Sequence, residues 1–250
     1  MTSRDIPSEI KRLVRQRDRF GCVVCGLPIY DYEHFVPYAE RKQHELENIY
    51  LACDRHHRAK GKVLSNSFIE RCRAKPFNAT HGRATENLHF SDGDFAIRMG
   101  NNNLTVSKNR KASALTVHGQ SLLDFRISED GVLVLSLHLF DSTDESLLSI
   151  VDNEIDVSTV KNWDITWEGT TIVVRRAPGK ISLRVSYDLN ARLVWVESAE
   201  LWCQGEMIAV APAVVSVRGN LIQECEGFDS DILICVGEPP ENASCANVVC

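Results

Sequence analysis

The chain has 250 residues, of which 44% are hydrophobic and 25% are charged, and its formal net charge is −6. This composition excludes collagen-like and wholly disordered chains and predicts a globular protein long enough for two domains. No run of about 18 apolar residues exists, and the chain opens on polar and charged residues. We therefore expect no signal peptide and no membrane partner. The odd number of cysteines, nine, favours a reducing compartment, so the expected location is cytoplasmic.

Charge is distributed unevenly along the chain. Residues 1–85 contain 16 Lys and Arg against 10 Asp and Glu, a net charge of +6, whereas residues 86–250 contain 12 against 24, a net charge of −12. A basic part suits a phosphate backbone and an acidic part repels it. We therefore expect DNA as a partner of the N-terminal part.

The first expected element is a helix that opens at Pro7-Ser8-Glu9 and continues to Arg19. Its basic side chains, which include Arg15 and Arg19, could contact a phosphate backbone or form a solvated helix face.

The segment that follows this helix contains four residues with the spacing of a zinc site. Cys22 and Cys25 form a Cys-x2-Cys pair, and Cys53 and His56 repeat that spacing further along the chain. Two such turns can present four ligands to one tetrahedral Zn²⁺. A segment of about 60 residues seldom buries enough apolar area to fold without a metal or a disulfide. We therefore predict a structural zinc; the alternative is four buried or unpaired side chains.

The residues around this pattern resemble the HNH family of nucleases. Glu33-His34, followed by Pro37, resembles the family's D/E-H-x-x-P. Asn48 begins N-I-Y-L-A-C, which resembles N-x-x-x-L-C, and C-D-R-H-H-R-A-K resembles C-x-x-C-H-x-x-K. The resemblance covers residues 5–62, roughly a quarter of the chain.

One residue departs from the family pattern. His56 stands where the family usually has a fourth cysteine, so either His56 or His57 could face the zinc. We assign His56 to zinc.

The resemblance implies a ββα-metal fold, with a hairpin that carries His34 and Asn48 and a following helix that carries His57. The local sequence agrees, because residues 35–39 and 48–52 are apolar runs that could pair as strands. Asp54 is a suitable N-cap for a helix that starts at Arg55.

The resemblance also implies a single-metal hydrolysis of the phosphodiester bond. In that mechanism His34 accepts a proton from water, and Glu33 and His57 hold one divalent ion, Mg²⁺ or Mn²⁺. Asn48 braces the loop between the strands so that His34 points at the phosphate.

Several basic residues are expected to contact nucleic acid, although Lys60 could instead cap the end of its helix. These candidates are Arg15, Arg19, Arg55, Arg58, Lys60 and Lys62.

A domain boundary is expected after Pro76, where a polar stretch without apolar periodicity follows. We predict a nuclease domain over residues 1–76, a linker over 77–86 and a β-rich domain over 87–250. Alternating, β-branched runs in the last part predict strands. The clearest are residues 132–140, 171–175, 181–187, 193–196 and 214–217.

The β-rich part also has a periodic turn signal. Gly93, Gly131, Gly169 and Gly205 each follow an acidic residue or glutamine at intervals of 38, 38 and 36 residues. Such a period favours a β-solenoid or parallel β-helix, and the alternative is an antiparallel sandwich with regular hairpin turns. The fold class expected for the whole chain is α+β.

The sequence therefore predicts a metal-dependent HNH endonuclease that cuts DNA, with a β domain for targeting, assembly into a homo-oligomer, docking of a protein partner, or regulation. The resemblance suggests bacterial restriction or defence as the context. The alternative is a zinc-knot module that binds nucleic acid without cutting it.

Overall fold

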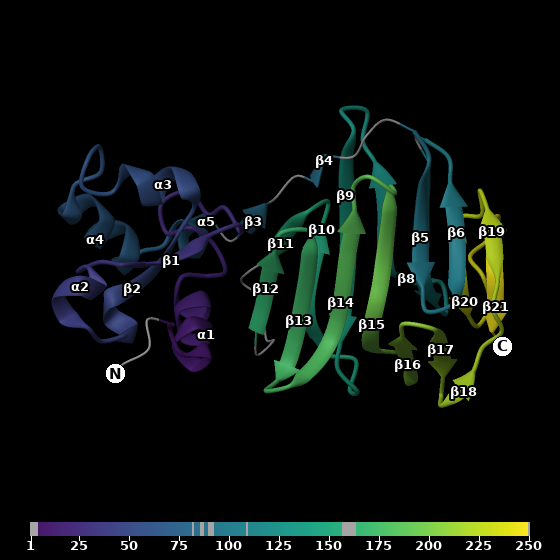
Figure 1. The fold of residues 1–250 in the computed structure, drawn as a ribbon. Coiled ribbons are helices and arrows are strands. Elements are labelled where there is room, and N and C mark those ends of the chain that lie inside the picture. The colour runs from purple at the N-terminus through teal and green to yellow at the C-terminus, as the bar shows by residue number, and fades with distance from the viewer. Residues whose placement is uncertain are drawn as a thin grey trace. The chain divides into compact units, whose positions relative to one another are not determined.

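The computed structural model describes residues 5–81, 83–85, 88–89, 93–108, 110–156 and 164–249. The chain divides into two compact units, residues 1–86 with 154–158 and residues 87–153 with 159–250. Among the described residues every helix belongs to the first unit, and strands predominate (Figure 1). The α+β class is therefore confirmed.

The first unit contains short helices and two small strand pairs. Its helices are α1 (Ser8–Arg17), α2 (Tyr38–Arg41), the 3-10 helix η1 (Leu46–Asn48), α3 (Asp54–Ala59), α4 (Asn66–Ala74) and α5 (Phe77–His81). Its strands are β1 (Asp31–His34), β2 (Ile49–Ala52), β3 (Arg83–Thr85) and β11 (Glu154–Asp156). β1 pairs antiparallel with β2, and β3 pairs antiparallel with β11. The segment 77–86, expected as a linker, thus contains α5 and β3.

The antiparallel strand pair lies partly where the sequence predicted it. β1 and β2 pair with His34 opposite Ile49. The second strand agrees with the predicted run 48–52, but the predicted strand over 35–39 is wrong. Pro37 explains the difference, because proline has no N–H for a strand ladder and its fixed φ suits the start of a helix. Helix α2 begins at the next residue.

β2 is the centre of the first unit, since all four of its residues are buried. Successive strand residues point to opposite faces. Ile49 and Leu51 pack with Val14 of α1 on one face, while Tyr50 packs in a second cluster with Ile69 of α4. A helix therefore covers each face of this short strand.

Two helix ends differ from the predicted positions by one or two residues. α1 ends at Arg17 and not at Arg19, because positive φ angles at Arg19 and Phe20 turn the chain toward the first cysteine pair. α3 begins at Asp54 with Cys53 as its N-cap, so Asp54 lies in the first turn. A carboxylate in the first turn still interacts favourably with the helix dipole.

The second unit consists of strands. They are β4 (Leu88–His89), β5 (Phe95–Met99), β6 (Asn102–Val106), β7 (Lys111–Val117), β8 (Gln120–Ile127), β9 (Val132–Phe140), β10 (Ser146–Val151), β12 (Asp164–Glu168), β13 (Thr171–Ala177), β14 (Lys180–Asp188), β15 (Leu193–Cys203), β16 (Glu206–Ala211), β17 (Val214–Val217), β18 (Asn220–Leu221), β19 (Glu226–Phe228), β20 (Ile232–Val236) and β21 (Cys245–Val249). The five clearest runs in the sequence all lie within these strands, in β9, β13, β14, β15 and β17.

Neighbouring strands of this unit pair mainly antiparallel, in the successions β7 to β10 and β12 to β18 (Figure 1). A parallel β-helix would instead pair the strands of successive coils in parallel, so the β-solenoid favoured from the sequence is not confirmed. Gly131, Gly169 and Gly205 have positive φ and lie in turns between antiparallel neighbours. Three of the four glycines of the sequence period therefore mark hairpin turns, where glycine adopts positive φ without strain.

Among the described residues of the second unit four strand pairings are parallel, and three of them join strands that are far apart in the sequence. β15 pairs with β5, β19 with β6, and β20 with both β7 and β21. β20 is buried along its whole length, as a strand covered on both faces should be. No helix in the described part of the chain is long and apolar enough to cross a membrane.

Candidate metal centre and candidate active site

The four predicted zinc ligands come from three separate places in the first unit. Cys22 and Cys25 lie in a tight turn after α1, Cys53 follows β2, and His56 lies in α3. The turn is closed by a hydrogen bond of 2.7 Å from the Gly26 N–H to the Cys22 carbonyl. The turn therefore brings the thiols of Cys22 and Cys25 close to His56 of α3.

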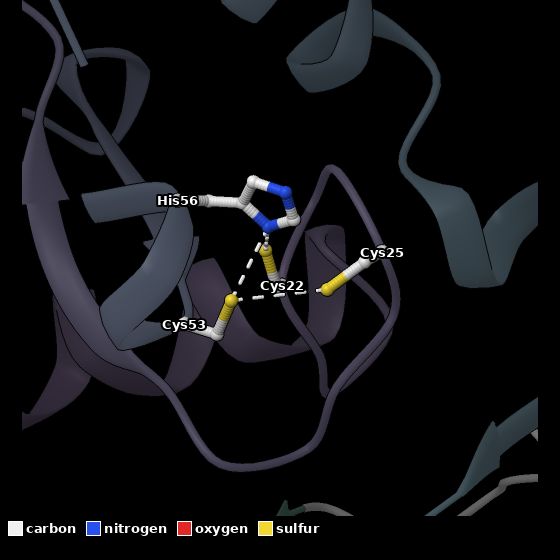
Figure 2. A group of neighbouring side chains, drawn as sticks. All are labelled: Cys22, Cys25, Cys53 and His56. Atoms are coloured by element: carbon white, nitrogen blue, oxygen red, sulfur yellow. Dashed lines mark hydrogen bonds between the residues drawn. The ribbon is translucent and has the colours of Figure 1, made fainter. Parts of the chain in front are cut away.

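The ligand atoms converge on one point, as Figure 2 shows. The Nδ1 atom of His56 lies 3.2 Å from Sγ of Cys53 and 3.4 Å from Sγ of Cys22. The Sγ atoms of Cys25 and Cys53 are 3.8 Å apart, and all four ligand atoms lie within 4.8 Å of one another. A tetrahedral zinc with Zn–S bonds of about 2.3 Å separates neighbouring sulfurs by about 3.8 Å. The Cys₃His cluster could therefore bind zinc, with His56 as the fourth ligand.

The thiols of the cluster influence one another. A hydrogen bond from Cys25 holds the pKa of Cys22 well below its usual range, and the same bond raises the pKa of Cys25. Burial is the main cause of the raised pKa of Cys53. Because zinc binds thiolates, metal uptake by this cluster would release protons.

A second group joins β1 to α3. Oε2 of Glu33 lies 2.8 Å from Nε2 of His57, and Oε1 of Glu33 lies 2.6 Å from Nζ of Lys60. Lys60 also donates a hydrogen bond to the main-chain carbonyl of His34. The side chain of His57 is 45% exposed while that of Glu33 is 18% exposed, so solvent reaches the pair from the helix side. The structure thus brings together the two residues expected to hold a divalent ion.

His34 lies beside a cluster of rings that the sequence did not single out. Its Nε2 atom is 3.1 Å from Nδ1 of His44, and the ring of His44 stacks on Tyr38 with centroids 4.7 Å apart and an interplanar angle of 15°. Burial, followed by the charge of His44, lowers the pKa of His34, which favours the neutral imidazole near pH 7. No spacing rule points to His44; its only signal is that it lies in the loop between two predicted strands.

Asn48 is buried and bridges two segments of backbone. Its Oδ1 atom accepts a hydrogen bond of 2.8 Å from the Val36 N–H, and its Nδ2 atom donates one of 3.0 Å to the Val36 carbonyl. The Asn48 carbonyl accepts a third bond, of 2.7 Å, from the Phe35 N–H. These bonds hold the chain directly after His34, which is the bracing position expected for this asparagine.

The basic residues expected to contact nucleic acid differ in exposure. Arg19, Arg55, Arg58 and Lys62 are exposed, whereas Arg15 is buried and donates a hydrogen bond to the Tyr32 hydroxyl. Arg58 forms an ion pair of 2.8 Å with Asp54. Lys60 is mostly buried against Glu33, as described above. Arg15 and Lys60 therefore take part in contacts within the fold.

Comparison with known proteins adds no relative. No protein-family model, no curated protein and no solved structure matches this chain.

Proposed function

We propose that the protein is a metal-dependent endonuclease that hydrolyses phosphodiester bonds in DNA by a single-metal, HNH-type mechanism. The observation that carries the proposal is the ion pair of 2.8 Å between Glu33 of β1 and His57 of α3. His34 also lies in β1, and Asn48 ends η1, directly before β2. The Cys₃His cluster, which lies at the start of α3, would stabilise this scaffold.

The spacing of Glu33 and His57 supports a site for a small divalent ion. Adjacent ligands of an octahedral ion at about 2.1 Å lie about 3 Å apart, close to the observed 2.8 Å between the two ligand atoms. Mg²⁺ or Mn²⁺ would neutralise charge that develops on the phosphate and the leaving oxygen. Lys60 holds the other carboxylate oxygen of Glu33 and so fixes the direction of the ligand atom.

The remaining side chains would act on the proton and the substrate. His34, neutral near pH 7, would accept the proton of the attacking water, because general-base catalysis needs an unprotonated nitrogen. Asn48 would keep the backbone after His34 in place through its two bonds to Val36. The exposed side chains of Arg55 and Lys62 would bind the phosphate backbone.

The acidic second unit would serve the nuclease without contacting DNA. Its strand-rich architecture and the net charge of −12 over residues 86–250 suit assembly into a homo-oligomer, docking of a protein partner, or restraint of cutting. Restriction or another defence role in bacteria is the biological context that we propose.

One observation favours a second candidate, a zinc-knot module that binds nucleic acid without cutting it. The ion pair of 2.6 Å between Lys60 and Glu33 already neutralises the carboxylate, so the site could persist without a divalent ion. In that case Glu33 would be a structural partner of Lys60 and His57.

Incubation of supercoiled plasmid with the purified protein and Mg²⁺ or Mn²⁺ distinguishes the two candidates. The nuclease proposal predicts nicking that EDTA abolishes and that His34→Ala reduces by roughly 10²-fold or more. His138→Ala, a histidine of the second unit that contacts Ser149, is the matched control and should cut normally. DNA binding without nicking in either metal would support the binding module instead.

A further inference from the structure

His44 is a histidine whose position suggests a role in the proposed reaction. Its Nδ1 atom lies 3.1 Å from Nε2 of His34, which is within hydrogen-bonding distance of two ring nitrogens. The two rings are tilted by 44° and their centroids are 5.2 Å apart, so they meet through their nitrogens and do not stack.

Local structure fixes the ring of His44. Pro37 is the N-cap of α2, so Tyr38 lies in the first turn of this helix. Lys42, the C-cap, has a left-handed backbone conformation, and its N–H donates a hydrogen bond of 2.7 Å to the Tyr38 carbonyl. This reversal brings His44 back over Tyr38, where the two rings stack. The sequence between β1 and β2 therefore places the rings of Tyr38 and His44 beside the ring of His34.

We propose that His44 is a positioning residue that accepts the Nε2 proton of His34 and thereby keeps Nδ1 of His34 as the unprotonated nitrogen that receives the proton from water. The inference rests on the proposed function, in which His34 is the general base.

The direction of the hydrogen bond follows from the chemistry of imidazole. A neutral ring has one protonated nitrogen, which donates, and one unprotonated nitrogen, which accepts. If His44 donated to His34, the Nε2 lone pair of His34 would be occupied and its Nδ1 would carry the proton, which leaves no nitrogen for water. If His34 donates, its Nδ1 lone pair stays available. Only the second arrangement lets His34 act as a base.

Two substitutions at position 44 separate the hydrogen bond from the ring stacking. His44→Asn keeps an acceptor atom near the position of Nδ1 but loses the ring, and His44→Phe keeps the ring on Tyr38 but loses the acceptor. Full-length wild type and both variants are compared for kcat and KM in Mg²⁺- or Mn²⁺-dependent plasmid nicking. The tautomer of His34 is measured in the same proteins by ¹⁵N NMR of the imidazole nitrogens, and zinc content and thermal unfolding show that each variant is folded.

We expect the Nε2–H tautomer of His34 in wild type. His44→Phe should lose this preference and lower kcat by about 10- to 100-fold with little change in KM, as loss of an orienting hydrogen bond typically does. His44→Asn should keep most of both. An Nδ1–H tautomer in wild type, normal kcat in His44→Phe, or equal losses in the two variants would each overturn the proposal. A wild-type protein that does not cut DNA would overturn the proposed function, while the tautomer measurement would still test the hydrogen bond.

Discussion

Two buried asparagines of this protein make the same kind of contact in different units. Asn48 bonds both polar backbone groups of Val36, at 2.8 and 3.0 Å. Asn153 accepts a hydrogen bond of 2.8 Å from the Leu135 N–H and donates one of 2.7 Å to the Leu133 carbonyl. Each side chain is buried and satisfies polar groups of a neighbouring backbone segment. Their effects on stability should be similar, and their effects on catalysis should differ.

We predict that Asn48→Ala and Asn153→Ala each lower the free energy of unfolding by about 1–3 kcal/mol, because the backbone groups that these side chains bond lose their partners. Asn48→Ala should also reduce the nicking rate of the folded protein, since the backbone after His34 loosens. Asn153→Ala should leave that rate unchanged. Denaturant unfolding and plasmid nicking of both variants test this, and equal nicking rates would remove Asn48 from the account of the site.

A buried carboxylate in the second unit should make stability depend on pH. Hydrogen bonds from Arg218, and then from His118, lower the pKa of Glu206 below its ordinary value. A depressed carboxylate pKa stabilises the fold above the unfolded value of about 4.5, and this contribution is lost as the pH falls through the folded pKa. The stability of wild type should therefore fall below pH 4.5, and Glu206→Gln should reduce that fall.

Glu200→Gln is the matched control for this pH effect, because Glu200 pairs with Arg176 at the surface, with 38% of the Glu200 side chain exposed. Exposed ion pairs contribute only about 0–1 kcal/mol. The measurement is denaturant unfolding at pH 7 and pH 3.5 for wild type and both variants. Equal pH dependence in wild type and Glu206→Gln would contradict the assignment.

Individual residues were predicted from the sequence where spacing constrained them. The four candidate zinc ligands follow a fixed spacing in two turns, so Cys22 and Cys53 could be placed in one cluster before the structure was known. His44 could not, because its contact with His34 depends on how α2 reverses the chain. Lys60 was expected at a DNA surface, but only the fold shows that its amine reaches Glu33.

At the level of elements, we predict that zinc binding by the Cys₃His cluster is required for the first unit to fold. β2 is only four residues long, and a strand this short gains little stability without other constraints. We predict that Cys53→Ser releases zinc and unfolds the first unit, because structural zinc supplies folding free energy directly. Cys72→Ser, which changes a half-buried cysteine of α4 outside the cluster, should retain zinc.

Zinc content of the purified variants, together with thermal unfolding, checks this prediction. Retention of zinc in Cys53→Ser would contradict the assignment of Cys53 as a zinc ligand, and a first unit that stays folded after losing zinc would mean that packing alone stabilises it.

The elements that the sequence predicted best are those with strong local signals. Alternating β-branched residues placed β9 and β17 correctly, and the helix signal at Pro7-Ser8-Glu9 placed the start of α1. The strand predicted over 35–39 is wrong, because Pro37 lies within this apolar run and is the N-cap of α2. The sequence also did not distinguish antiparallel from parallel strand pairing in the second unit, because regularly spaced glycines occur both in hairpin turns and at the corners of a solenoid.

On the scale of the whole molecule, charge and architecture divide the chain in the same way. The first 85 residues carry a net charge of +6 and the rest carry −12, and the division between the compact units follows residue 86. One exception is β11, which pairs with β3 and belongs to the first unit although it lies far along the chain. Composition alone could not have indicated that a strand from the acidic part completes the basic unit.

The decisive experiment for a metal-dependent nuclease compares wild type and His57→Ala for zinc content and for plasmid nicking over a titration of Mn²⁺ or Mg²⁺. If the zinc and the catalytic ion occupy separate sites, both proteins contain one zinc per chain and nicking by wild type rises with added metal. Nicking by His57→Ala is then reduced by roughly 10²-fold at each metal concentration. Loss of zinc from His57→Ala, or nicking that His57→Ala leaves unchanged, would contradict the assignment of Glu33 and His57 to a catalytic ion separate from the zinc cluster.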